Sequence, residues 1–279
     1  MKSCKMVENI EFCRQINAKD MSSAINVITY NVNGIRSALS KGLLDWLRAE
    51  KPEVLCLQEL KAEPSQFDAS AFEKLGYHCF WKPAVKKGYS GVALLSLIRP
   101  DQVMESSGME LYDAEGRILR ADFGDTTLFS CYFPSGTTGE ERQQFKMKFL
   151  ADFRQFIDAL RRERKKILVC GDYNICHQPI DIHDPVGNKN SSGFLPEERD
   201  WMTRFFESGW TDTFRHFNRE PHQYSWWSFR ANARANNKGW RIDYNNGTAE
   251  LNDSLLSSTI LMEVKHSDHC PVKLTLKLG

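Results

Sequence analysis

The feature that most constrains the fold of this chain is an arrangement that occurs twice: an apolar strand, an amphipathic helix and a second apolar strand. In the first copy the segments are INVITYN, LSKGLLDWLRAE and EVLCLQEL, which lie between Ile25 and Leu60. In the second copy they are TLFSCYF, a long stretch from Gly139 to Lys166, and ILVCGDYN. Alternation of strands and helices along one chain is typical of α/β folds. We therefore predict two sheets that pack face to face, with helices outside, related by internal duplication.

Further apolar runs predict strands outside these two units: GVALLSL, ILRADFG, YSWWSF, WRIDY, TILMEV and VKLTLKL. The loop from Asn174 to about Leu195 is long for a structureless connection, which indicates a functional role. No linker rich in Pro, Gly or Ser divides the chain, so we predict one domain over residues 22–279. Residues 1–21 are polar and without pattern, which indicates either a loose N-terminal appendage or translation that begins at Met21.

The composition excludes several classes of protein. Hydrophobic residues make up 41% and charged residues 26% of the chain, which excludes a disordered or collagen-like protein. No run approaches the ~18 apolar residues that a membrane-spanning helix needs. The net charge is +1, so a polyanionic partner has to be met by a local basic patch. The eight cysteines form no C-x-x-C pair, which favours buried reduced thiols in a cytoplasmic protein over a redox or metal site.

Four acidic residues stand at the end of an apolar run or beside an aromatic residue: Glu59, Asp172, Asp243 and Asp268. Each of them alone is more simply explained as a turn or cap residue. Together they indicate a cation site, because carboxylates are rarely buried unless they are paired or bind a metal. Oxygen ligands of this kind suit Mg²⁺ or Mn²⁺ better than zinc.

His269 is the strongest candidate for an acid–base residue among the seven histidines. It lies between Asp268 and Cys270, at the entry to the last predicted strand. A carboxylate has to fix its tautomer, and Asp243 at a strand end is the expected partner. The alternative is an ordinary surface or core histidine.

The stretch from His222 to Ile242 carries cations and aromatic rings but no acid. Its members are Arg230, Arg234, Lys238 and Arg241, interleaved with Tyr224, Trp226, Trp227, Phe229 and Trp240. This mixture suits a phosphate backbone with an extruded sugar packed on aromatic surface. For Trp227 and Phe229 a place in the core is an equal alternative, since neighbours in a strand point to opposite faces.

Seven short segments occur in a fixed order along the chain: YNVNGIR, LCLQELK, YFPSG, GDYNICH, GNKNSSGF, GWRIDY and HSDHCP. In content and order they resemble the exonuclease III class of abasic-site DNA endonucleases, and the resemblance covers about residues 25–279. This class belongs to the endonuclease/exonuclease/phosphatase superfamily. The resemblance implies a four-layer α/β sandwich similar to that of deoxyribonuclease I, with metal-dependent phosphoesterase chemistry.

The resemblance also implies roles for single residues. The implied ligands of a catalytic Mg²⁺, with Mn²⁺ as the alternative, are Asn31, Glu59, Asp172, Asn174 and Asp268. The implied catalytic group is Tyr132, Asp172, Asn174, Asp243 and His269. The implied substrate-binding residues are Asn33, Lys61, Asn188, Trp226, Arg230 and Trp240, with further DNA-backbone contacts from Lys82, Lys86, Lys87 and Lys189. Whether Asp172 or His269 is the base stays open, as does the number of metal ions.

By the same resemblance we expect hydrolysis of the phosphodiester 5′ to an abasic site in double-stranded DNA. Secondary 3′→5′ exonuclease and 3′-end-cleaning activities are expected from the same site, in a cytoplasmic monomer. One alternative is a nucleic-acid-binding protein that has lost catalysis, which the intact motifs oppose. Another is a phosphatase of the superfamily that acts on lipid or inositol phosphates.

The chain departs from the family pattern at three places. Residues 245–247, Asn-Asn-Gly, follow WRIDY where the family continues an apolar strand, and Asn-Gly favours a turn. Ser135 stands in YFPSG where some relatives carry Asn. Ile28 and Thr29 precede YN where some animal relatives have a redox-active cysteine nearby, so we predict no transcription-factor redox function.

Overall fold

The computed structural model describes residues 24–278, which form two six-stranded sheets. The first sheet has the strand order β11-β12-β1-β2-β4-β3, and the second has the order β5-β6-β7-β8-β10-β9. The strands of the first sheet are β1 (Ala24–Asn31), β2 (Val54–Gln58), β3 (His78–Lys82), β4 (Val92–Ser96), β11 (Leu255–Ile260) and β12 (Val272–Lys277). Those of the second are β5 (Gln102–Met104), β6 (Ile118–Phe123), β7 (Thr126–Tyr132), β8 (Lys166–Asp172), β9 (Trp210–Asp212) and β10 (Asp243–Thr248).

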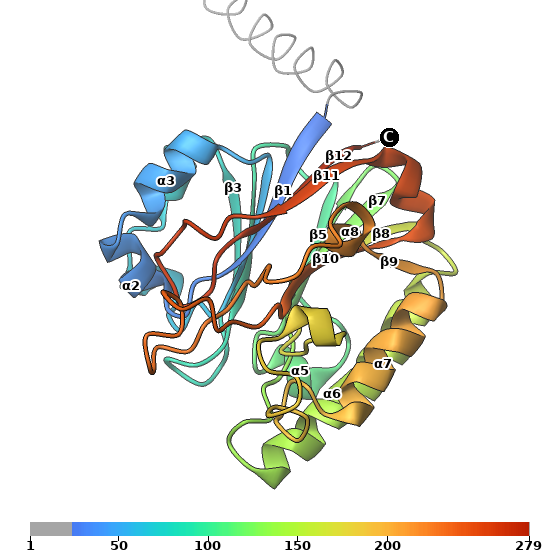
Figure 1. Ribbon diagram of the computed structural model, residues 1–279. Coiled ribbons are helices and arrows are strands. Elements are labelled where there is room, and N and C mark those ends of the chain that lie inside the picture. Colours follow the sequence, from blue (N-terminus) through green and yellow to red (C-terminus); the bar gives the residue numbers. More distant parts are fainter. Residues whose placement is uncertain (1–23, 279) are drawn as a thin grey trace, which may run out of the picture.

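The two sheets share one succession of strand pairings. In each sheet the central pair is parallel, β1 with β2 and β7 with β8. All the other neighbouring strands pair antiparallel. The internal duplication predicted from the sequence is therefore present in the topology, and the predicted two-sheet α/β sandwich is confirmed (Figure 1).

Helices lie on the outer faces of the sandwich (Figure 1). Those associated with the first sheet are α2 (Ile35–Ser40), α3 (Leu43–Glu50) and α4 (Ser70–Glu73). The second sheet is covered by α6 (Glu140–Leu160) and α7 (Pro196–Glu207). The shorter elements are α5 (Glu110–Asp113), α8 (Thr213–Phe217) and the 3₁₀ turns η1 (Pro64–Gln66), η2 (Pro179–Asp181) and η3 (Ala249–Ser254).

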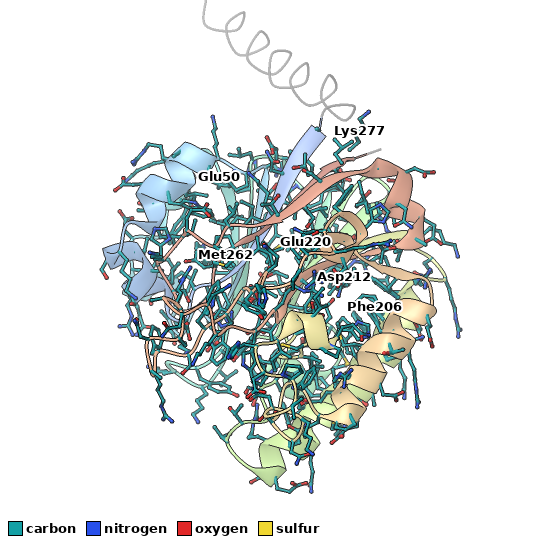
Figure 2. All side chains as sticks on the ribbon, in the orientation of Figure 1. Glu50, Phe206, Asp212, Glu220, Met262 and Lys277 are labelled. Carbon is teal, nitrogen blue, oxygen red and sulfur yellow. The ribbon has the colours of Figure 1, made fainter. Side chains whose placement is uncertain are left out.

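Three apolar layers hold these elements together. Between the sheets, Val27 and Leu94 of the first sheet pack with Leu128 and Leu168 of the second. A second cluster lies between the first sheet and α2, α3 and α4, and a third between the second sheet and α6 and α7. Side chains fill the space between the ribbons (Figure 2). Because strands β2, β4, β7 and β8 are buried on both faces, they are apolar throughout rather than alternating.

Several sequence predictions at the C-terminal part of the chain are wrong. YSWWSF forms no strand, only isolated bridges of Trp226 to Trp240 and to His269. In WRIDY the strand starts only at Asp243, and TILMEV contributes only its first residues to β11. The turn expected at residues 245–247 is absent, because they lie inside β10. There β8 and β9 pair with β10 on both sides, and these backbone hydrogen bonds outweigh the local preference of Asn-Gly for a turn.

The predicted appendage over residues 1–21, the domain boundary at residue 22 and the thiols of Cys4 and Cys13 lie outside the described residues. Within residues 24–278 no helix combines the length and apolar character needed to cross a bilayer. The six cysteines of that region are free thiols, and all of them except Cys79 are buried.

Candidate active site

The two parallel strand pairs end in polar side chains, and the fold brings those ends together from both sheets. Asn31 ends β1 and Glu59 follows β2, whereas Asp172 ends β8 in the other sheet. The Nδ2 group of Asn31 donates hydrogen bonds of 2.8 Å to Glu59 Oε1 and 2.8 Å to Asp172 Oδ2. The Asn31 amide thus bridges two carboxylates that belong to different sheets. The bridge lies at the carboxyl ends of the parallel strands, where ligands bind in α/β folds.

Glu59 and Asp172 form, with His269, a group that could hold a metal ion. One ligand atom from each lies within 4.8 Å of the others. Carboxylate oxygens at this spacing fit a hard divalent cation, which would also offset the repulsion between two carboxylates at a largely buried site. Asn31 is placed differently from a ligand: its Oδ1 accepts a hydrogen bond of 2.9 Å from the backbone N–H of Asn33, and its NH₂ group faces the carboxylates.

His269 is buried, and its two ring nitrogens face two different aspartates. Nδ1 lies 2.9 Å from Oδ2 of Asp243, and Nε2 lies 3.9 Å from Oδ2 of Asp172. Ser225 fixes Asp243 in turn, because its Oγ donates to Asp243 Oδ2 at 2.7 Å. The ring is therefore held from behind by Asp243, with its other nitrogen directed toward Asp172.

The electrostatic environment shifts the pKa values of this group. Burial and the nearby Asp243 carboxylate raise the pKa of Asp172 above the ordinary value of an aspartate, although His269 opposes the shift. Burial alone would lower the pKa of His269, but Asp243 outweighs burial and raises it. Burial, followed by the charges of Glu59 and Asp172, raises the pKa of Tyr132, so its phenol keeps its proton. Such groups of mutually shifted residues are typical of catalytic sites.

Asn174 holds the second oxygen of Asp172. Its backbone N–H donates to Asp172 Oδ1 at 2.7 Å, and its Nδ2 donates to Asp172 Oδ2 at 3.3 Å and to the carbonyl of Phe133 at 3.0 Å. Asn174 reaches this position with a left-handed backbone (φ 52°). The carboxylate is thereby fixed in orientation by its neighbour two residues later.

A second hydrogen-bonded chain borders the group on the side of the first sheet. Asn33 Nδ2 donates to Asp268 Oδ1 at 2.9 Å, and Trp226 Nε1 donates to Asp268 Oδ2 at 3.0 Å. Lys61 Nζ donates to Asn33 Oδ1 and forms an ion pair of 2.7 Å with Glu59 Oε2. Burial opposes ionisation of Asp268, but the charge of His269 and these hydrogen bonds keep its pKa low.

These side chains open into a cleft of about 650 Å³. Its polar lining includes Glu59, Tyr132, Asp172, Asn174, Asp268 and His269, and the loops at residues 135–139 and 191–193 form its rim. Trp226 and Trp240 form an aromatic wall, with ring centroids 6.0 Å apart and ring planes at 89°. A chamber with polar groups at one side and aromatic rings at the other suits a ligand that has both a charged and an apolar part.

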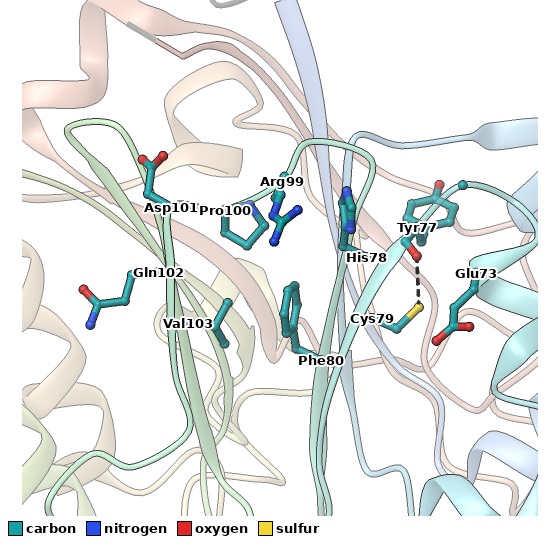
Figure 3. A pocket seen from close by; sticks show the side chains of 11 residues that line it. Glu73, Tyr77, His78, Cys79, Phe80, Arg99, Pro100, Asp101, Gln102 and Val103 are labelled. Carbon is teal, nitrogen blue, oxygen red and sulfur yellow. Dashed lines mark hydrogen bonds between the residues drawn. The ribbon is translucent and has the colours of Figure 1, made fainter. Parts of the chain in front are cut away.

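A second cavity, of about 690 Å³, lies between the edge strands β3 and β5 (Figure 3). Its lining includes His78, Phe80, Arg99 and Val103. His78 pairs with Ser96 at the end of the first sheet opposite to Glu59. This cavity contains none of the candidate site residues.

The sequence of residues 28–244 matches the endonuclease/exonuclease/phosphatase family. The chain belongs to this family. The resemblance predicted from the seven short segments is thereby confirmed.

Relatives within the family extend over most of the chain. An exodeoxyribonuclease of Bacillus subtilis is 39% identical over 256 residues, which cover 91% of this chain and all of the relative. The DNA repair nuclease APEX1 of Danio rerio is 38% identical over 266 residues, 94% of this chain and 86% of the relative. An AP endonuclease structure from Archaeoglobus fulgidus superposes with a TM-score of 0.83 at 29% identity, covering 90% of this chain and 99% of that one.

Within this family member, the structure divides the predicted basic stretch into buried and exposed cations. Arg241 is 1% exposed and pairs with Asp181 and Asp212, so it is unable to contact DNA. Arg234 donates to the carbonyls of Ser267, Met262 and Val264 and lies over the ring of the buried Trp227. Arg230 and Lys238 are exposed, as is Phe229. The stretch is therefore largely structural, with a few exposed members.

Asn188, a predicted substrate-binding residue, does not line the cleft. Its Nδ2 donates to the carbonyls of His183 and Asp184, and its Oδ1 accepts from Ser191. Arg230 also lies outside the lining residues. Sequence reasoning missed Ser225, and it gave no role to Ser192 and Gly193 individually although it singled out their loop, because small residues in loops carry no periodic signal. It also missed Lys146, although a lysine on the apolar face of the predicted long helix, three residues before Phe149, was a usable signal.

Proposed function

We propose that this chain is a metal-dependent DNA repair nuclease that hydrolyses the phosphodiester 5′ to an abasic site, with 3′→5′ exonuclease and 3′-end-cleaning activity. The observation that carries the proposal is the convergence of Glu59, Asp172 and His269 on one cleft. Relatives named exodeoxyribonuclease and DNA repair nuclease support this reaction. A solved neighbour described as a 3′-5′ exonuclease, from Neisseria meningitidis, supports the secondary activity.

Hydrolysis of a phosphodiester requires a positioned water, neutralised phosphoryl oxygens and a stabilised leaving group. The contact of 2.9 Å between His269 Nδ1 and Asp243 Oδ2 favours the protonated ring, so we propose His269 as a cationic partner of a phosphoryl oxygen rather than as the base. Asp172, oriented by Asn174, then aligns and deprotonates the water. The protonated phenol of Tyr132 lies at the same cleft and can donate to the phosphate or to the leaving oxygen.

Glu59 and Asp172 would hold the metal ion, for which we propose Mg²⁺, with Mn²⁺ as the alternative. Asn31, Asn174 and Asp268 are further proposed ligands. Asn31 and Asn174 hydrogen-bond to Asp172, and Asp268 lines the same cleft. Asn31 would have to turn its amide to present Oδ1, because its NH₂ group faces the carboxylates. A divalent cation there would neutralise phosphoryl charge and keep Asp172 ionised.

The aromatic wall of Trp226 and Trp240 is the proposed seat of the extruded abasic sugar, because a sugar without its base presents a compact apolar face. Lys61 and Asn33, which lie beside Glu59, are proposed contacts to the phosphate, although neither is among the lining residues of the cleft. Exposed cations, among them Arg230, Lys86 and Lys87, are proposed contacts to the DNA backbone, and Asn188 and Lys189 belong to a loop in the same role.

The test is an incision assay on a duplex that contains one abasic site, with Mg²⁺ and with EDTA. We expect a single nick that leaves a 3′-hydroxyl and a 5′-deoxyribose phosphate, and no nick in EDTA. An inositol phosphate and a phosphorylated lipid serve as competing substrates. Binding of the abasic duplex without incision in Mg²⁺, or preferential hydrolysis of either phosphate ester, would refute the proposal.

We further propose a cytoplasmic monomer. The free, mostly buried thiols of the described region support a reducing compartment. Glu59, Asp172 and His269 converge within a single chain, which supports the proposal that activity needs no second copy. Sedimentation of the active enzyme at assay concentration tests the second point.

A further inference from the structure

An ion pair without any solvent exposure lies directly behind the cleft, between α6 and α7. Lys146 Nζ is 2.5 Å from Glu198 Oε1, and both side chains are 0% exposed. Neither residue lines the cleft. Burying two charges costs so much desolvation that such a pair rarely stabilises a fold better than apolar residues would. Its other contacts therefore indicate what the pair does.

Lys146 connects the pair to the catalytic aspartate. Its Nζ also donates to the backbone carbonyl of Asn174 at 2.8 Å. Asn174 in turn holds both oxygens of Asp172 through its N–H and Nδ2 groups. The ammonium group thus fixes, from behind, the turn that sets the direction of the Asp172 carboxylate.

Glu198 connects the pair to the loop at the rim of the cleft beside Asn174. Its Oε2 accepts from the backbone N–H of Gly193 at 2.6 Å and of Leu195 at 3.0 Å. Gly193 (φ +95°) is pressed against the aromatic wall: a Cβ there would lie 3.0 Å from the Trp240 ring and 3.1 Å from the Asn174 carbonyl oxygen. Glu198 therefore fixes the loop that packs against Trp240.

Gln143, one turn before Lys146 on α6, completes the network. Its Nε2 donates to Glu198 Oε1 at 3.0 Å, and its Oε1 accepts from Ser192 Oγ at 2.7 Å. Ser192 and Gly193 both line the cleft. Both members of the ion pair thus contact a residue that lines the cleft, Lys146 through Asn174 and Glu198 through Gly193.

We propose that Lys146 and Glu198 are a positioning pair for incision. Lys146 holds Asn174, and hence Asp172, in line with the reacting phosphate. Glu198 holds the Gly193 loop against Trp240 and so shapes the seat of the abasic sugar. This inference rests on the proposed nuclease function, and neither residue contacts substrate.

The test compares wild-type protein with the double variant Lys146→Met/Glu198→Gln. The double change removes both charges together, so no unpaired charge is left in the interior, and the new amide oxygen can still accept from Gly193. We measure kcat and KM for incision of the abasic duplex, and the ratio of Kd values for intact and abasic duplexes. We expect kcat to fall by about 10²-fold, the cost of a small misplacement of reacting groups, and the Kd ratio to approach one.

Lys148→Met is the matched control, since Lys148 lies on the same helix in an exposed ion pair with Asp152. It should leave all three quantities unchanged. Circular dichroism establishes that each variant is folded. If the double variant is not, Gln143→Met is measured instead, because it removes the contacts to Ser192 and Glu198 without leaving an unpaired charge. A folded variant with a lower melting temperature but unchanged kcat and Kd ratio overturns this inference alone. Wild-type protein that fails to incise overturns the proposed function and this inference with it.

Discussion

At the scale of the residue, four of the eleven non-glycine residues with positive φ in the described region belong to the site or border it. Asn33, Glu59, Lys61 and Asn174 all have left-handed backbones, with φ of 43°, 52°, 50° and 52°. Asparagine tolerates this conformation, whereas Glu and Lys lose about 1–2 kcal/mol each in it. The ion pair of Glu59 with Lys61 and the bridging amide of Asn31 hold these residues in place. The fold thus maintains a costly conformation at the residues that form the cleft.

The first prediction concerns the carboxylate that both Asn31 and Asn174 hold. Asp172→Asn keeps the size of the side chain but is unable to accept a proton from water. We expect kcat for incision to fall by about 10²–10⁴-fold, the usual contribution of a positioned acid–base group. Single-turnover incision measures the loss, and gel-shift titration should show that the abasic duplex still binds.

Asp200→Asn is the control for this variant, because Asp200 lies in an exposed ion pair with Arg204 on α7. It should incise at the wild-type rate. Retention of more than a tenth of the wild-type rate by Asp172→Asn would contradict the assigned role.

At the scale of the element, β10 shows how tertiary structure overrides local preference. Asn245 and Asn246 are buried in the strand, and the chain continues as a strand through Gly247. Asn245 faces the interior of the sandwich, where its Nδ2 donates to the carbonyl of Val272 at 2.9 Å. Asn246, which alternation places on the other face near Tyr173, makes no well-formed hydrogen bond at either side-chain polar atom, whereas Asn245 lacks a partner only at Oδ1. A buried amide without partners is a source of instability.

The second prediction follows from the difference in hydrogen bonding between Asn245 and Asn246. Asn246→Leu replaces the unpartnered amide with an apolar group of similar volume. We expect the free energy of unfolding to rise by about 1–3 kcal/mol, the desolvation penalty of unsatisfied polar groups. Urea denaturation measures the change, and incision should stay at the wild-type rate.

Asn245→Leu is the paired control, because it removes the bond to Val272. Its free energy of unfolding should rise less than that of Asn246→Leu, or should fall. A lower unfolding free energy for Asn246→Leu would mean that the amide has a partner, such as buried water.

The third prediction concerns the ion network that anchors η2 to β9 and β10. Asp181 is 0% exposed and accepts hydrogen bonds from Arg241 and Arg215. Burial alone would raise its pKa, but the two arginines outweigh burial and lower the pKa from 3.8 to about 2. A pKa that is lower in the folded state gives stability that is present above the unfolded pKa and is lost as the pH falls. We therefore expect Asp181 to contribute about 2–3 kcal/mol that disappears between about pH 4 and pH 2.

Urea denaturation at a series of pH values measures this loss. Asp181→Asn should be less stable at neutral pH but should lack this part of the acid dependence. Asp45→Asn, at an exposed ion pair with Arg48, should follow the wild-type curve. An identical acid dependence in Asp181→Asn would assign the loss to other carboxylates.

The elements that could be predicted from the sequence are those whose burial shows as a continuous run of apolar residues. The central strands β1, β2, β7 and β8 are apolar runs that end in polar residues, so both the sandwich and the positions of Glu59 and Asp172 follow from the pattern. Ion pairs between residues far apart in the sequence leave no such local pattern, so they could not be predicted. From the sequence alone, Arg241 is interpreted as a DNA-binding cation. Asp181, which neutralises it, is 60 residues away in the sequence. The same holds for Lys146 and Glu198, which lie 52 residues apart.

At the scale of the whole molecule, the site belongs to neither sheet alone. Glu59 comes from the first sheet and Asp172 from the second. His269 precedes β12, which pairs with β1 in the first sheet. Asn31 and Asp172, which are hydrogen-bonded, are 141 residues apart in sequence. A cation held by Glu59 and Asp172 would therefore join the two sheets, so that its binding and the stability of the sandwich are linked.

The fourth prediction tests this linkage. A cation at about 100 times its Kd should add about 2.7 kcal/mol to stability, and thus raise the melting temperature by about 5–10 °C. Thermal unfolding with Mg²⁺, with Mn²⁺ and with EDTA measures the shift. Glu59→Gln should remove most of it.

Glu73→Gln is the control, since Glu73 is exposed on α4 and borders the other cavity. It should keep the full shift. An equal shift in Glu59→Gln would place the cation elsewhere on the molecule.

The pairing of β12 with β1 has a consequence for incomplete products of translation. A chain that stops anywhere before residue 269 lacks the histidine, and it also leaves the backbone groups along β1 without their antiparallel neighbour. Prematurely terminated polypeptides therefore lack the proposed catalytic histidine, and they expose an open strand edge that can pair with other chains. The proposed incision activity would thus become available only once nearly the whole chain has been synthesised.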